Sequence, residues 1–170
     1  VIVMSPKSLL RHKLSTSSLQ DISEQGFQEV IGDSDAPDVD AVKRVIVCSG
    51  KVYFDLHDAR NKREIDDTAI IRVEQLYPFP KEQLSQQLRN YSNAKSVVWC
   101  QEEPLNQGAW QYMQPLLSTL LKSKQQLQVV ARPASASPAV GYYQKHIEQL
   151  QELLEQAFST QKVTKIALGK

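Results

Sequence analysis

The chain has 170 residues, a length that a single compact domain with short extensions usually has. Its hydrophobic fraction of 41% is that of an ordinary globular protein. No apolar run approaches the roughly 20 residues of a spanning helix, which excludes an integral membrane protein. Twenty basic and nineteen acidic residues give a net charge of +1, so charge gives no reason to expect nucleic acid or an anionic membrane as the main partner.

Cys48 and Cys100 are the two cysteines of the chain. Two thiols are too few for a disulfide-stapled secreted scaffold or a four-thiolate zinc site. We therefore expect reduced core thiols, a reducing, cytoplasmic setting and no metal site. His12, His57 and His146 have no neighbours at metal-ligand spacing and are interpreted as surface or hydrogen-bonded side chains.

Residues 1–42 differ in composition from the rest of the chain. Residues 1–4 (VIVM) form a β-type apolar run, which we interpret as the last strand of an upstream domain, so that residues 1–13 lead into a linker and the chain is a piece of a larger protein. Residues 14–42 hold seven acids and no Lys or Arg, which predicts an acidic linker with a short edge strand at residues 27–31. Asp33, Asp35 and Asp38 lack the glutamate that closes a Ca²⁺ loop, so we expect solvated carboxylates.

From residue 43 on, apolar runs alternate with amphipathic segments. Strands are predicted at residues 44–48, 69–73, 96–100 and 127–131. Helices are predicted at residues 51–63, after Pro80 with Leu84, Leu88 and Tyr91 on one face, at residues 108–121 around Pro115, and from about Pro138 with Tyr143, Ile147, Leu150, Leu154 and Ala157 on one face. The alternation predicts an α/β domain over residues 43–158, a three-layer sandwich with a mostly parallel sheet, followed by a tail at residues 159–170.

Polar residues follow the predicted strands, at the edge where parallel sheets bind ligands. Ser49, Gly50 and Lys51 join the first strand to its helix, where free N–H groups and the lysine charge favour an anion. The alternative is a tight turn in which Ser49 caps the helix. Arg132 follows the fourth strand and is predicted to hold a phosphate or a partner's carboxylate, with a structural ion pair as the alternative.

Glu102 and Glu103 follow the third strand. Neighbours in an extended segment point in opposite directions, so we expect one glutamate to cap the next helix and the other to form an ion pair, rather than acid/base chemistry at a shared proton. Trp110 is interpreted as a core residue or a subunit contact. Together with Ser135 and Ser137, which lie in a rigid loop of small residues, it marks a candidate interface. No catalytic residue is assigned.

Five distinctive sequence segments follow one another along the chain. They are SPKSLLRH (residues 5–12), CSGK (48–51), EQLYPF (74–79), WCQEEPLNQGAW (99–110) and RPASASPAVG (132–141). On these segments the chain closely resembles the C-terminal end of the decarboxylating first component of bacterial 2-oxoglutarate dehydrogenase, over nearly all of residues 1–158. The resemblance implies a fold like the C-terminal domain of transketolase.

The resemblance also implies a parent enzyme that uses thiamine diphosphate and Mg²⁺ to decarboxylate 2-oxoglutarate in the citric acid cycle. It would pass the succinyl group to the lipoyl arm of the dihydrolipoyl succinyltransferase component of a multienzyme complex. The Gly-Asp-Gly and Asn-Asn segments typical of the cofactor site do not occur in this sequence, so no cofactor is expected here.

Within that parent the implied role is an assembly and regulatory module that packs on upstream domains of the same chain and builds a homodimer. A nucleotide or acyl-CoA effector is implied near Ser49, Gly50, Lys51 and Arg132. The alternative is a stand-alone α/β module that binds a phosphorylated small molecule.

Overall fold

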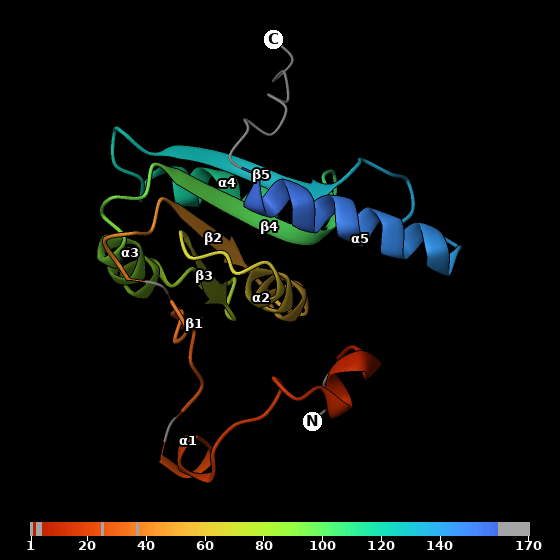
Figure 1. Cartoon of the computed structure of the whole chain (residues 1–170), viewed down its shortest axis with the longest axis horizontal. Coiled ribbons are helices and arrows are strands. Elements are labelled where there is room, and N and C mark those ends of the chain that lie inside the picture. Colours follow the sequence, from red (N-terminus) through yellow and green to blue (C-terminus); the bar gives the residue numbers. More distant parts are fainter. Residues whose placement is uncertain (1, 3–4, 25, 37, 160–170) are drawn as a thin grey trace.

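The computed structural model describes residues 2, 5–24, 26–36 and 38–159. Within these residues, strands and helices alternate after a short helical start (Figure 1). The elements in chain order are η1 (Lys7–Arg11), α1 (Leu19–Glu24), β1 (Val30–Ile31), β2 (Arg44–Cys48), α2 (Val52–Lys62), β3 (Thr68–Val73), α3 (Lys81–Asn90), β4 (Ser96–Pro104), α4 (Trp110–Ser118), β5 (Gln126–Arg132) and α5 (Tyr143–Phe158). None of the described helices is long and apolar enough to cross a membrane.

The strands form one sheet in the order β1-β3-β2-β4-β5. β2 pairs in parallel with β3 and β4, and β5 pairs in parallel with β4, whereas β1 runs antiparallel to β3. The register places Ile46 of β2 opposite Ile70 and Val98. The chain passes from β2 to β3 on one side and then crosses to β4 on the other, so the strand order reverses beside β2. Open α/β sheets bind ligands at such a reversal.

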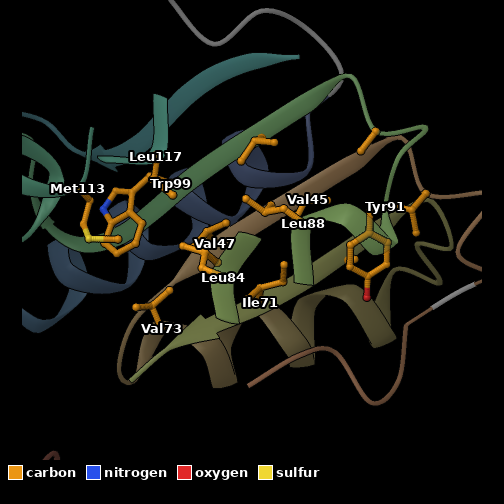
Figure 2. Packing of buried hydrophobic residues seen from close by; sticks show 14 residues of the cluster. Val45, Val47, Ile71, Val73, Leu84, Leu88, Tyr91, Trp99, Met113 and Leu117 are labelled. Carbon is orange, nitrogen blue, oxygen red and sulfur yellow. The ribbon is translucent and has the colours of Figure 1, made fainter. Parts of the chain in front are cut away.

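Helices α3 and α4 cover one face of the sheet. Their inward side chains are spaced three or four residues apart, which keeps them on one side of each helix. Figure 2 shows the resulting cluster, which includes Val45, Val47, Ile71, Leu84, Leu88, Trp99, Met113 and Leu117. Full burial of each large apolar side chain contributes about 1.5–3 kcal/mol to stability.

Helices α2 and α5 cover the opposite face (Figure 1). The cluster there includes Ile46, Cys48, Val52, Leu56, Ile70, Val98, Cys100, Leu153, Leu154 and Ala157. Alternate residues of β2 therefore enter different cores, as a strand buried on both faces requires. The predicted three-layer α/β class with a mostly parallel sheet is confirmed, and the architecture is consistent with a transketolase C-terminal-like fold.

The four predicted strands are present, and the predicted edge strand is limited to β1. The start of the last helix was predicted wrongly: α5 begins at Tyr143, not near Pro138. Before it, Ser137 Oγ donates to the Ala139 carbonyl oxygen (2.9 Å), within an irregular loop over residues 133–142. Tyr143 and Ile147 are 80% and 42% exposed, so they do not belong to the predicted buried stripe.

The prediction of solvated carboxylates is wrong for Asp33. Its side chain is 1% exposed, forms an ion pair with Arg60 of α2 and accepts the backbone N–H of Ile70 (2.7 Å). Asp35 lies 2.8 Å from Nε2 of His57, which lowers the pKa of the Asp35 carboxyl group through that hydrogen bond. The sequence did not reveal these contacts, because both partners lie on α2, beyond any local pattern.

The predicted boundaries at residues 13, 42 and 158 stay predictions. Of the strand predicted at residues 1–4, residues 1, 3 and 4 lie outside the described residues, and Ile2 is exposed. Residues 160–170 of the predicted tail also lie outside the described residues.

Candidate functional site at the carboxyl edge of the sheet

The first candidate residues lie where β2 ends. Gly50 has a φ of +72°, a left-handed conformation that favours glycine, and it turns the chain from β2 toward α2. The N-cap residue of α2 is Lys51 and no described side chain caps this end, so the predicted Ser49 cap is not formed. Instead, Nζ of Lys51 lies 2.5 Å from Oδ2 of Asp55. The lysine charge therefore already has a partner within α2.

Gln101, which the sequence reasoning did not single out, organises the end of β4. Its side chain is buried, and its Oε1 accepts Nε1–H of Trp99 and the backbone N–H of Trp110, both at 2.9 Å. Its Nε2 donates to the backbone carbonyl oxygens of Gln107 (2.7 Å) and Pro104 (3.1 Å). One amide thus holds both ends of the turn before α4. The sequence feature that could have indicated this role is a polar residue directly after the apolar run VVWC.

Gly108 lies in this turn with a φ of +66°. A Cβ atom at this position would lie 2.9 Å from Nε2 of Gln101 and 3.0 Å from Cβ of Glu103. Glycine is therefore required both for the backbone conformation and for space. Within the run at residues 99–110, which carried most of the resemblance, Gln101 thus bonds to Trp99, Pro104, Gln107 and Trp110.

Arg132 ends β5 and is 5% exposed. Its Nη2 lies 3.4 Å from Oε1 of Glu102 and 3.1 Å from Nδ1 of His146. Its Nε is buried and has no hydrogen-bond partner among the described residues. The alternative of a structural ion pair is confirmed, with Glu102 as the partner. Glu103 is exposed and neither glutamate caps α4, so the predicted glutamate cap is wrong.

Two loops meet beside Arg132. The side chain of Asn106 donates to the backbone carbonyl oxygen of Ser135 (2.9 Å) and accepts its N–H (3.0 Å). Nε2 of Gln107 donates to the same carbonyl oxygen (3.0 Å). Beside these contacts lies an open pocket of about 180 Å³, which we call the Arg132 pocket. Its walls are mostly prolines, alanines and serines of residues 133–140, with Pro104 and Gln149.

Of the four residues predicted to hold a phosphate, three follow β2 and Arg132 ends β5, and these two strands are not neighbours because β4 lies between them. Lys51 is paired with Asp55, and Arg132 is paired with Glu102. Each of the two cations of the predicted phosphate site therefore already has a carboxylate partner. Anion binding at Ser49, Gly50, Lys51 and Arg132 stays a prediction.

The three candidate interface residues also stay predictions. Trp110 is half-buried and packs against the cluster between the sheet and the α3–α4 layer. Ser135 and Ser137 are exposed in the loop that forms the Arg132 pocket. The indole thus has a core contact in this chain, while the serines face solvent.

A second cluster that the sequence reasoning missed lies at the end of β3. The guanidinium carbon of Arg72 lies 4.4 Å from the ring centroid of Tyr53 and 5.5 Å from that of Phe54. Nε of Arg72 lies 3.0 Å from Oε1 of Glu74, and the ring of His12 lies 5.4 Å from that of Phe54. The only sequence signal was a single arginine within the apolar strand.

The thiols of Cys48 and Cys100 are free and fully buried, on directly opposite residues of β2 and β4. Burial raises the pKa of both thiols, so they are protonated at neutral pH. Across the part of the chain that the structure describes, no three His, Cys, Asp or Glu side chains lie close enough to hold a metal ion.

These features define an α/β domain with a mostly parallel sheet, whose strand-end loops are held by internal hydrogen bonds and ion pairs. The chain belongs to the family described as 2-oxoglutarate dehydrogenase C-terminal, whose model matches residues 16–158. It is 52% identical over 159 residues to the 2-oxoglutarate dehydrogenase E1 component of Cupriavidus necator, and 50% identical over 159 residues to that of Haemophilus influenzae. Each alignment covers 94% of this chain but only 17% of the relative. The family identified by resemblance is thereby confirmed.

Proposed function

We propose that the chain is the C-terminal assembly and regulatory domain of a 2-oxoglutarate dehydrogenase E1 component and is not catalytic alone. In this proposal the whole E1 component is cytoplasmic, decarboxylates 2-oxoglutarate with thiamine diphosphate and Mg²⁺, and transfers the succinyl group to the lipoyl arm of dihydrolipoyl succinyltransferase. Family membership supports the parent enzyme. The cofactor chemistry is assigned to other parts of the parent, since the typical cofactor segments do not occur in this sequence.

The observation that carries the assembly role is the N-terminal arm (residues 5–24 and 26–28). Neither η1 nor α1 contains a buried residue. Leu10, Leu19, Ile22 and Phe27 are 70–86% exposed. Figure 1 shows the arm leading away from the sheet beyond β1 and turning back below α2, where the ring of His12 lies 5.4 Å from that of Phe54. Because burial of apolar surface contributes about 25 cal/mol per Å², an apolar arm of this kind favours docking on another surface. We assign that surface to the upstream domains or to the homodimer partner.

The regulatory part of the proposal places a nucleotide or acyl-CoA phosphate at Ser49, Gly50 and Lys51, with Arg132 as a further candidate. The turn at Gly50 leads into the N-terminus of α2, a favourable position for an anion. Because Lys51 is bound to Asp55, a phosphate has to compete with that carboxylate. We therefore expect Asp55→Asn to tighten binding of adenosine monophosphate or coenzyme A, measured by calorimetry. If the chain were a stand-alone phosphate-binding module, the wild type would already bind these ligands tightly.

The assembly role is tested with the part of the Cupriavidus necator relative that this chain does not cover. The chain is expected to bind that polypeptide in a pull-down. The double variant Leu19→Asp with Ile22→Asp should weaken binding at least tenfold, because two charges would enter an apolar contact. The matched control, Gln20→Asp with Ser23→Asp, changes polar positions of the same helix and should leave binding within threefold. Equal losses in both double variants would refute the role of the arm.

A second measurement tests whether the chain is catalytic alone. Calorimetry of the isolated chain with thiamine diphosphate and Mg²⁺ is expected to show no micromolar binding, which would correspond to roughly −8 kcal/mol. Turnover of 2-oxoglutarate by the isolated chain is likewise not expected. Micromolar cofactor binding would contradict the assignment of the cofactor site to other parts of the parent.

A further inference from the structure

We propose that the Arg132 pocket is a carboxylate-binding site and that its occupant is an acidic side chain of another polypeptide segment. The inference rests on the geometry of the pocket and does not depend on the proposed function. It assigns Arg132 to a site separate from the turn at Gly50, since β4 lies between the two strands.

The guanidinium of Arg132 is incompletely satisfied. A guanidinium presents five N–H donors in a rigid fork, and a buried donor without a partner is unfavourable. Here Nη2 contacts Glu102 at 3.4 Å and His146 at 3.1 Å, while Nε has no partner among the described residues. Charge-assisted N–H···O bonds are usually about 2.7–2.9 Å long, so the contact with Glu102 is weak. An acceptor that binds Nε can therefore also bind Nη2, provided that it displaces the long contact with Glu102.

That edge matches a carboxylate. Parallel N–H groups at Nε and Nη2 bind the two oxygens of one carboxylate in a bidentate geometry. Nε itself has almost no accessible surface, so the ligand reaches it only if residues 133–140 shift. Most of this loop is exposed, and the hydrogen bonds of Ser137 stay within the loop, to Ser135 and Ala139. Ser135 is also held by Asn106 and Gln107, so the shift has to move these contacts or break them. Such a shift breaks no strand or helix.

The pocket is ill suited to a nucleotide. Its volume of about 180 Å³ lies below the roughly 300–1,000 Å³ of pockets that enclose whole ligands. The Ser135 hydroxyl oxygen accepts the Ser137 N–H (3.2 Å), and the Ser137 hydroxyl donates to Ala139, so the Ser137 hydroxyl is not a free donor for phosphate oxygens. A phosphate would also carry roughly two negative charges toward the carboxylate of Glu102.

An acidic side chain fits the same walls better. Pro104, Pro133 and Pro138 offer apolar surface for its methylene groups, and Gln149 contributes an amide. The small exposed residues at 133–139 permit another backbone to approach closely enough to insert a short side chain. Burial of the carboxylate would be compensated by the charge of Arg132.

The test uses nuclear magnetic resonance of the full ¹⁵N-labelled chain, in which the arginine Nε–H signals are observed directly. The probes are glutamate blocked at both backbone ends, the equivalent blocked glutamine, acetate and inorganic phosphate. We expect blocked glutamate to shift the Arg132 Nε–H signal at millimolar concentration, with at least tenfold weaker effects from the other three probes. Blocked glutamine is the matched control for the charge.

Three variants complete the design. Arg132→Lys keeps a positive charge but removes the fork, so blocked glutamate should no longer bind. Because this variant lacks the Arg132 Nε–H signal, binding is followed on the backbone amides of residues 133–140. Arg89→Lys, at an exposed position on α3, should respond like the wild type. Glu102→Gln leaves Arg132 in place and removes the competing carboxylate, so blocked glutamate should bind at least threefold more tightly.

An unmoved Arg132 Nε–H signal with blocked glutamate would overturn the proposal, as would unchanged affinity in Glu102→Gln. An equal or stronger response to phosphate would overturn the choice of a carboxylate. An equal response to acetate would overturn the choice of a polypeptide side chain as the occupant.

Discussion

Asp33 and Arg60, 27 residues apart in the chain, form an ion pair in which both side chains are at most 3% exposed. Arg60 also donates to the Thr68 carbonyl oxygen (3.3 Å), and Asp33 accepts the N–H of Ile70 (2.7 Å). The pair therefore joins the segment after β1 to both α2 and β3. Removing one member of such a pair leaves an uncompensated charge in the protein interior.

We expect Asp33→Ala to lower the free energy of unfolding by about 3–5 kcal/mol, because Arg60 would lose its carboxylate partner while staying buried. Urea denaturation measures the change. The matched control is Asp58→Ala, which removes an exposed ion pair with Lys62 at 3.9 Å and should cost less than about 1 kcal/mol. Similar losses of unfolding free energy in both variants would show that the buried pair contributes no more to stability than the exposed pair.

Three glycines allow a graded test of the turn around Gln101. Gly141→Ala should be nearly neutral, since its Cβ would meet nothing within 4 Å. Gly50→Ala should cost about 1–2 kcal/mol for its left-handed backbone alone. Gly108→Ala adds a contact of 2.9 Å with Gln101 and should be the most destabilising of the three in thermal unfolding. A Gly108 variant no worse than the Gly50 variant would contradict the role of Gln101.

The buried thiols should be unreactive in the folded chain. Burial raises the pKa of both Cys48 and Cys100, and the thiolate is the reactive form, so raising the pH to 8 should not expose a nucleophile. A colorimetric disulfide reagent should label neither thiol within minutes in buffer and both in 6 M guanidinium. Prompt labelling of either thiol in the native chain would refute the prediction.

The candidate interface can be mapped by hydrogen exchange on the chain and on a full-length E1 component. If Trp110, Ser135 and Ser137 border an interface in the parent, the amides of residues 132–140 should exchange at least tenfold more slowly in the full-length protein. The amides of β2, which are central in the sheet of the chain itself, serve as the internal control and should be protected in both. Equal exchange of residues 132–140 in both samples would argue against the interface.

The sequence by itself was sufficient for the fold class. The run at residues 44–48 has three consecutive β-branched apolar residues at its centre, without alternation, which is the local signature of a strand buried on both faces. The spacing of Leu84 and Leu88 likewise predicts which side of α3 is buried. These features depend on neighbours within a few residues, so they can be read without knowing the tertiary structure. The family resemblance, carried mainly by residues 99–110, was also a property of the sequence alone.

Tertiary structure decided the pairings of the polar groups. Asp33 stands in a segment rich in turn-forming residues and was predicted to be solvated, yet its partner Arg60 comes from α2. Nothing local distinguishes a carboxylate that meets a buried guanidinium from one that meets water. Arg132 pairs with Glu102 of β4, the strand that lies between β2 and β5, whereas Lys51 pairs with Asp55 four residues along the same helix, a contact that local spacing can predict. Strand order and the partners of buried charges arise from contacts between distant parts of the chain. The local sequence pattern does not encode such contacts.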